Sequence, residues 1–336
     1  MKKKILSDIP FSVLELATVA QGSTPAQTFA KSLELAQHVE KFGYKRFWLS
    51  EHHNMVSVAS SATSVLIGYI ASGTSHMRIG SGGIMLPNHS PLAIAEQFGT
   101  LESLYPGRID LGLGRAPGTD QLTAMALRGD FFNNANEFPQ NVVKLQTYLS
   151  KENSNSKVRA IPGEGLDIPI WILGSSTDSA QLAAFLGLPY AFASHFAPAQ
   201  FFAAIDLYRK NFKPSKHLDK PYVLACVNVI AADTDAEANK LATSLFQMFL
   251  GIVTGIRQPL QPPVESMEGI WTEYQKEALN QMLSLSFIGS AQTIKKDLQD
   301  FVDQTQIDEI MIISNVYDQK AKIHSYELFA EIMSSK

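Results

Sequence analysis

The run Glu51-His52-His53 places a carboxylate beside two imidazoles, directly after a short apolar segment. Histidine exchanges protons near neutral pH, so an imidazole that faces a cavity can act as an acid or a base. If the apolar segment is a strand, adjacent side chains point to opposite faces. Two alternatives follow: His52 faces the interior, or Glu51 and His53 do. A metal site is disfavoured, because no matching carboxylate ends a second strand.

Three further segments suit a flat ligand that carries a phosphate. Arg115 ends a glycine-rich run, and a guanidinium matches phosphate oxygens. Gly174-Ser175-Ser176-Thr177-Asp178-Ser179 leads into a helical pattern, and a helix N-terminus attracts phosphate. Gly82-Gly83 ends an apolar segment where a planar ring could approach bare backbone. The competing interpretations are a surface ion pair, a plain helix cap and a β-bulge.

The elements that must position these residues alternate between strands and helices. Eight apolar segments are expected to be strands, at residues 11–17, 46–50, 78–87, 108–114, 168–173, 190–194, 222–231 and 309–314. Helical patterns separate them, which predicts an α/β protein with a single (β/α)8 TIM barrel over residues 1–336, with insertions. A doubly wound open sheet is the alternative. It would usually show a Gly-x-Gly turn after the first strand, and residues 17–24 have none.

Three segments are expected to depart from the simple repeat or to add to it. Residues 116–138 are expected to be irregular. The proline-rich stretch from Gly255 to Gly269 is too long for an ordinary connection, so we expect a lid or a disordered loop, mobile over about 255–285. A helix over residues 59–72 would carry a stripe of small side chains on one face, because they recur every four residues. The stripe consists of Ser60, Ser64, Gly68 and Ser72.

Composition excludes several classes of protein. The 336 residues are 45% hydrophobic and 18% charged, which suits a large core. A formal net charge of −4 provides no basic surface for nucleic acid. Cys226 is the single cysteine, so no internal disulfide can form and a reducing, cytoplasmic location is expected. Asp8, Pro10 and Glu15 interrupt an export signal, and no apolar run has membrane-spanning length.

Taken together, the motifs resemble the bacterial luciferase-like flavin monooxygenase family, and within it the "luciferase family oxidoreductase, group 1" type. The resemblance rests on Glu51-His52-His53-Asn54, Gly80-Ser81-Gly82-Gly83, Leu86-Pro87-Asn88-His89-Ser90-Pro91 and Gly112-Leu113-Gly114-Arg115-Ala116-Pro117-Gly118. It implies an FMN-type flavin at the C-terminal ends of the barrel strands.

The resemblance also assigns roles to individual residues. It implies that His52 is catalytic, with Glu51 beside it to orient or tune the site, and that no metal is needed. It implies a non-proline cis peptide at Gly82-Gly83, against the flavin ring. The residues expected to contact the phosphate are Arg115, Gly174, Ser175, Ser176 and Ser179.

The activity and the partners follow from the same resemblance. The expected reaction is monooxygenation of a small, aldehyde-like organic substrate with O2 and with reduced FMN from a partner reductase. Hydride transfer with a deazaflavin and a non-catalytic flavin-binding role are the alternatives. Gly114 stands where light-emitting relatives have a reactive cysteine, which argues against light emission. Luciferase-like barrels commonly pair through the region of residues 59–72, so a homodimer is expected.

Overall fold

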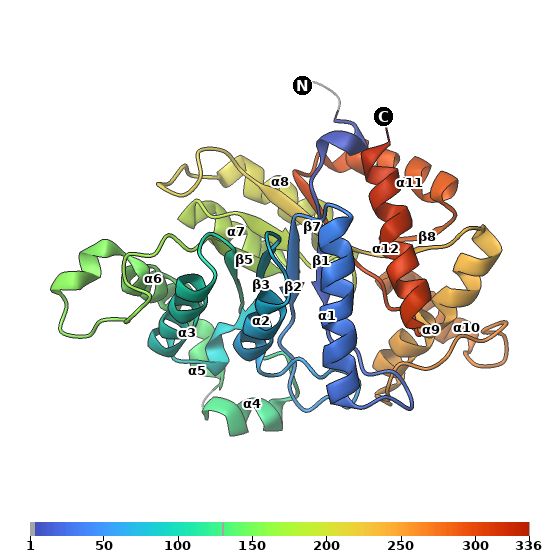
Figure 1. The fold of residues 1–336 in the computed structure, drawn as a ribbon, viewed down its shortest axis with the longest axis horizontal. Helices are drawn as coiled ribbons and strands as arrows, with labels where there is room; N and C mark the ends of the chain where they lie inside the picture. Colours follow the sequence, from blue (N-terminus) through green and yellow to red (C-terminus); the bar gives the residue numbers. More distant parts are fainter. Residues whose placement is uncertain (1–3, 130, 336) are drawn as a thin grey trace.

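The computed structural model describes residues 4–129 and 131–335, which form a closed barrel of parallel strands surrounded by helices (Figure 1). The ring runs β1-β2-β3-β4-β5-β6-β7-β9, and β9 pairs back onto β1. The strands are β1 (Phe11–Glu15), β2 (Arg46–Leu49), β3 (Arg78–Met85), β4 (Ile109–Gly114), β5 (Ile170–Gly174), β6 (Tyr190–Phe192), β7 (Val223–Ala231), β8 (Ser286–Gly289) and β9 (Glu309–Ile313). The predicted (β/α)8 barrel is confirmed, and the open sheet is wrong.

Helices cover the outside of the ring and connect successive strands (Figure 1). They are α1 (Pro25–Lys41), α2 (Thr63–Ser72), α3 (Pro91–Leu104), α4 (Gln121–Arg128), α5 (Phe131–Asn136), α6 (Phe138–Leu149), α7 (Thr177–Leu186), α8 (Phe201–Asn211), α9 (Asp235–Thr254), α10 (Glu273–Met282), α11 (Ala291–Thr305) and α12 (Gln319–Ser334). The capping box predicted at Thr24 is present, with Pro25 in the first turn. None of the described helices is both long and apolar enough to cross a membrane.

Three segments differ from the sequence-based expectation. Residues 116–138 are not simply irregular, because they include α4, α5 and the start of α6. The second helix begins at Thr63 rather than at residue 59. The segment 255–285 contains α10, and β8 follows it and pairs in parallel with residues 228–231 at the C-terminal end of β7. Leu260 is tied to the loop after β1 by hydrogen bonds with Val19 and Gln21. The mobility of 255–285 stays a prediction.

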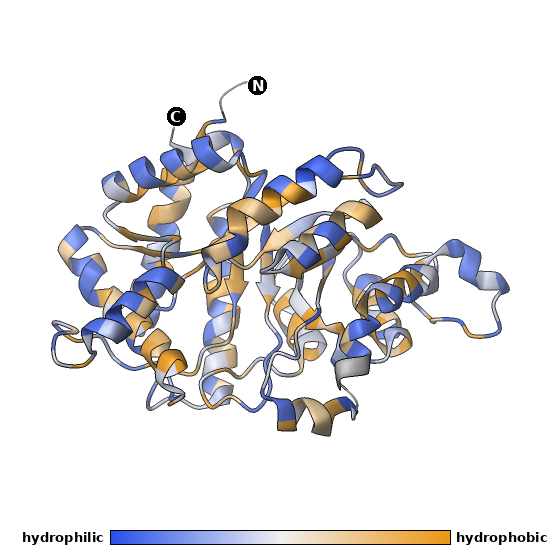
Figure 2. Ribbon diagram, turned by 180° about the vertical axis from the view of Figure 1, so that it is seen from behind, coloured by the Kyte–Doolittle hydropathy of each residue, from blue (hydrophilic) through white to orange (hydrophobic). Residues whose placement is uncertain are grey.

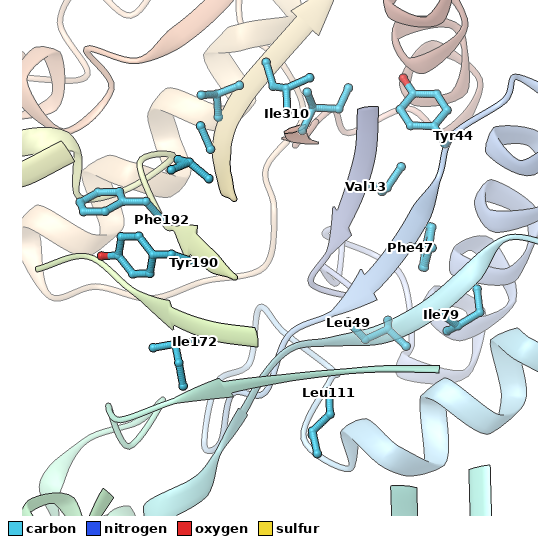
Figure 3. Packing of buried hydrophobic residues seen from close by; sticks show 14 of the residues in the cluster. Val13, Tyr44, Phe47, Leu49, Ile79, Leu111, Ile172, Tyr190, Phe192 and Ile310 are labelled. Atoms are coloured by element: carbon cyan, nitrogen blue, oxygen red, sulfur yellow. The ribbon is translucent and has the colours of Figure 1, made fainter. Parts of the chain in front are cut away.

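The strands are apolar on both faces because helices cover one face and the barrel interior the other. Alternate residues divide between them: Val13 and Phe47 pack under the helices, whereas Leu14 and Trp48 fill the interior. Figure 3 shows the outer layer, including Val13, Phe47 and Ile79. Figure 2 shows hydrophobic segments in the central strands and alternating hydrophobic and hydrophilic bands along the surrounding helices. This packing gives the strand ends a rigid frame.

A buried ionic network fills the opposite end of the barrel from the strand C-termini. Arg46, the first residue of β2, donates from Nε to Glu309 Oε1 at 2.7 Å and from Nη1 to Asp110 Oδ2 at 2.8 Å. The indole of Trp48 donates to the same Asp110 oxygen at 3.1 Å. The network joins β2, β4 and β9. It leaves the other end of the barrel for chemistry, which is where barrel active sites lie.

Candidate active site

A cavity of about 390 Å³ opens at the C-terminal ends of the strands, at the end of the molecule where α4 lies in Figure 1. Most of the residues predicted from the sequence meet there. Those on its wall are His52, Gly82, Arg115, Gly174, Ser175, Ser176 and Ser179. Glu51 and Gly83 lie beside it but not on its wall. The C-terminal ends of six strands, β1 to β6, contribute these and neighbouring residues, so the site exists only in the folded barrel.

One corner of the cavity combines Arg115 with the start of α7. Ser176 is the N-cap of α7, and its hydroxyl makes no capping bond. Thr177 N–H donates to Gln200, but across the described residues the N–H groups of Asp178 and Ser179 have no acceptor. Arg115 Nη2 is 3.5 Å from Asp178 Oδ2, an exposed pair that contributes little. Free helix N–H groups beside a guanidinium form an anion site.

Ser179 and Gly174 shape this corner more than they offer free donors. Ser179 Oγ donates to the Ser176 carbonyl at 2.8 Å and lies 3.0 Å from the Tyr190 hydroxyl. A Cβ on Gly174 would overlap the Ser179 side chain. Glycine is therefore required at 174 for this packing. Ser175 and Ser176 also line the cavity.

Gly82, within β3, puts bare backbone on the cavity wall, at a point where the register against β4 shifts between Ser81 and Ile84. The Gly82–Gly83 peptide is cis, as the resemblance implied. A Cβ would come within 2.8 Å of Leu14 Cδ1 at Gly82, and within 2.8 Å of the Gly112 carbonyl at Gly83. A Cβ on Gly114 would lie 2.9 Å from Met85 Sδ, so a cysteine there would need Met85 to move. Packing thus excludes a side chain at Gly82 and Gly83, which leaves backbone where a flat ring could approach.

His52, and not His53, faces the cavity. Its Nδ1 is 3.3 Å from the Gly118 carbonyl. A carbonyl only accepts, so Nδ1 carries the proton and Nε2 presents a lone pair. Burial is the largest influence on His52 and lowers its pKa, which keeps the ring neutral. His53 Nε2 instead lies 2.9 Å from Glu51 Oε1. The alternative with Glu51 and His53 facing inward is wrong.

Glu51 is a buried anchor behind the wall. Its carboxylate lies 2.9 Å from His89 Nε2 and accepts from the Met85 N–H at 3.0 Å. Asn88 Nδ2 donates to it at 3.3 Å. Burial alone would raise the pKa of Glu51, but the hydrogen bonds from His53 and His89 lower it to about 2. Glu51 therefore holds the connection after β3 in place. Among the described residues, no group of His, Cys, Asp and Glu could hold a metal ion.

The sequence analysis missed His195, which follows β6. Its ring lines the same cavity and also a second, largely apolar chamber of about 290 Å³. His52, Phe196 and Arg257 border both spaces. The signal was available, because a polar residue at a strand end is what marked His52 and Arg115. Arg128, the next arginine after Arg115 in the sequence, donates to the Pro87 and His89 carbonyls and does not line the cavity.

The strand ends of the closed parallel barrel thus bring an anion corner, the backbone of a glycine and a histidine onto one cavity. The family model described as "Luciferase-like monooxygenase" matches residues 9–308, and the chain belongs to that family. It is 51% identical over 324 residues to the "Luciferase-like monooxygenase" of Escherichia coli (strain K12), covering 96% of this chain and 97% of that one. It is 54% identical over 330 residues to "Uncharacterized protein YvbT" of Bacillus subtilis (strain 168), covering 98% of each.

Relatives with more specific names match less of the chain or match less closely. The "N-acetyl-S-alkylcysteine monooxygenase" of Bacillus subtilis is 39% identical over 189 residues, 55% of this chain and 57% of that one. The crystal structure of apo-MsnO8 is similar with a TM-score of 0.87 and 33% identity, over 98% of this chain and 99% of that one. Two structures share the fold alone: an FMN complex of a Baeyer-Villiger monooxygenase from Pseudomonas putida (TM-score 0.75, 18% identity, 98% of each chain) and an F420-dependent secondary alcohol dehydrogenase (0.72, 14%, 98% and 100%).

Proposed function

We propose that this protein is a flavin-dependent monooxygenase that uses reduced FMN and O2 to oxidise a small organic substrate. The observation that carries the proposal is the corner where Arg115 meets the free N–H groups at the start of α7, on the same cavity as the bare Gly82 wall. The corner suits a phosphate and the wall suits a planar ring. The cavity volume of about 390 Å³ lies within the range of small-molecule sites.

Each residue has a task in this proposal. Arg115 and the N–H groups of α7 would hold the phosphate, and Gly82 would leave room for the ring. The chemistry that bound reduced FMN supplies is the activation of O2. His52 would accept a proton at Nε2, since Gly118 fixes the proton on Nδ1. Glu51 is a positioning residue, because its carboxylate holds the neighbouring wall and does not reach the cavity.

The competing proposal is an enzyme that transfers hydride with a deazaflavin, since the fold is shared with an F420-dependent dehydrogenase. The test is to supply isotopically labelled O2 with reduced FMN and a panel of aldehydes, ketones and thioethers. We expect labelled oxygen in a product with wild-type protein, and strongly reduced product with His52→Ala. Product formation only with a reduced deazaflavin, without oxygen label, would select the alternative. Consumption of reduced flavin without any product would point to a non-catalytic flavin-binding protein.

Partners and location are part of the same proposal. The protein would work in the cytoplasm, where a flavin reductase supplies reduced FMN. The single cysteine, Cys226, is buried and unpaired, which suits a reducing compartment. In a coupled assay, a purified flavin reductase with NADH and FMN should support product formation as well as chemically reduced FMN does. Product formation with chemically reduced FMN but not with the reductase would argue against a reductase as the source of reduced FMN.

We also propose a homodimer, through a different part of α2 from the stripe of small residues. Ser60 lies before α2 and is buried, with its hydroxyl donating to the Ser50 carbonyl. A Cβ on Gly68 would face Leu101 of α3 at 3.4 Å. The stripe therefore packs partly within the subunit, and the idea that all four residues share one free face is wrong. Val65 and Tyr69 are 69% and 41% exposed, and they offer the apolar contact instead.

A further inference from the structure

His195 is a polar group at the mouth of the barrel with a buried nitrogen that has no partner among the described residues. It follows β6, and its ring borders the glycine-walled cavity, the apolar chamber and a small space deeper in the barrel. Its Nδ1 is buried without a hydrogen-bond partner in the described part of the chain. Buried polar atoms nearly always have a partner, so an exception calls for an explanation.

The two nitrogens of this ring differ in access. Nδ1 is sealed from solvent. Nε2 is not sealed, and it has no hydrogen-bond partner within residues 4–129 and 131–335. Nε2 is therefore the nitrogen that reaches the cavity. Burial lowers the pKa of His195 to about 3, and the neighbouring His52 adds to that effect, so the ring is neutral near pH 7. One nitrogen then carries a proton and the other does not.

The proton belongs on Nε2. A proton on Nδ1 would create a buried N–H without an acceptor, which is the rarer and costlier defect. A proton on Nε2 can bond to whatever occupies the cavity. His52 has the opposite arrangement, because its Nδ1–H is held by the Gly118 carbonyl and its Nε2 offers a lone pair. The two rings thus present a donor and an acceptor to one space.

The chamber beside His195 indicates what the donor would meet. Its wall is mostly apolar, and no carboxylate lies among the described residues that form it. The apolar side chains include Met55, Met248, Phe249, Ile252, Met282 and Ile313. Arg257 and a few amides lie on the same wall, and Arg257 is exposed. Flexible methionines adapt to varied apolar shapes. The space suits an apolar body that ends in an oxygen acceptor.

We propose that His195 is a substrate-binding residue that donates a hydrogen bond from Nε2–H to the carbonyl oxygen of an apolar aldehyde or ketone in this chamber. The inference rests on the proposed monooxygenase function and adds a residue that would bind its substrate. His195 also borders the apolar chamber, and Gly82, the expected wall of the flavin ring, does not line that chamber. The chamber therefore assigns His195 to the substrate and not to the ring.

The first test reads the tautomers directly, in flavin-free protein labelled with nitrogen-15. Two-bond correlation spectra distinguish Nδ1–H from Nε2–H rings, and His195→Gln and His52→Gln spectra assign the two signals. We expect Nε2–H for His195 and Nδ1–H for His52 near pH 7. An Nδ1–H or doubly protonated His195 would overturn the proposal. The reading needs no turnover, so it stands apart from the success or failure of the monooxygenase assay.

The second test adds methyl pentyl ketone to the same sample, with hexyl chloride as a probe of similar length that lacks a strong acceptor. The ketone should move the His195 Nε2 signal and the chloride should not. His195→Phe should weaken ketone binding about 5- to 10-fold, the worth of one neutral hydrogen bond, whereas His195→Gln should keep it within about twofold. Phe196→Leu is the matched control, since it borders both cavities without a donor. A His195 signal that moves with FMN but not with ketone would overturn the assignment.

Discussion

Replacing Glu51 by glutamine tests whether this carboxylate anchors the wall of the site. The side chain is buried and its pKa is lowered from an ordinary 4.5 to about 2. A lowered carboxylate pKa contributes stability above the unfolded value, and the contribution is lost as pH falls through the folded value. The difference corresponds to about 3 kcal/mol near pH 7. Glutamine keeps the shape but removes the charge that His53 and His89 bind.

The assay is urea unfolding followed by tryptophan fluorescence, for wild type and Glu51→Gln, at several pH values from 7 down to 3. The stability gap should be about 3 kcal/mol near pH 7 and should shrink to less than half of that at pH 3. Glu331→Gln is the control, because that side chain is exposed and should show almost no gap. A gap that is negligible at pH 7, or one that does not change with pH, would refute the reasoning.

Other predictions concern the wall, the acid–base group and the dimer. His52→Ala should lower turnover about 100-fold or more and His53→Ala much less, as steady-state kinetics would show. Equal losses would contradict the assignment. Gly118→Ala should cost about 1–3 kcal/mol in urea unfolding, since φ is 65° and a backbone carbonyl lies 2.6 Å from the new Cβ. Gly129 also has a positive φ, but no atom of the described residues lies near an added Cβ there. If Gly129→Ala cost as much as Gly118→Ala, crowding would not be the cause. Tyr69→Arg should convert a dimer to a folded monomer in light scattering, and a monomeric wild type would end the dimer proposal.

The barrel could be predicted from the sequence because its signals are repeated and local. Strands buried on both faces appear as continuous apolar runs, and several are followed by a helix with its own start signal. Thr24 and Pro25 are one such start, and Ser90 with Pro91 is another. The motifs at the strand ends then converge by geometry alone, since parallel strands bring their C-terminal ends to one face.

The parts that escaped prediction depend on contacts distant in sequence. β8 has four residues and is a strand because it pairs with the end of β7, which a short window cannot reveal. α4 has eight residues, too few for a clear apolar repeat. The role of Glu51 as an anchor depends on Met85 and His89, which are more than thirty positions away. The orphan nitrogen of His195 is likewise a property of packing.

The central claim is that the strand-end cavity binds a flavin phosphate between Arg115 and the start of α7. The most direct measurement is calorimetric titration of wild type and Arg115→Ala with FMN and with riboflavin, which lacks the phosphate. Arg159→Ala serves as the control, because Arg159 pairs with Glu164 at the surface away from the cavity. We predict that Arg115→Ala weakens FMN binding by about 1.5–3 kcal/mol, the worth of a charged hydrogen bond, and leaves riboflavin binding unchanged. Unchanged FMN affinity, or an equal loss for both ligands, would contradict the claim.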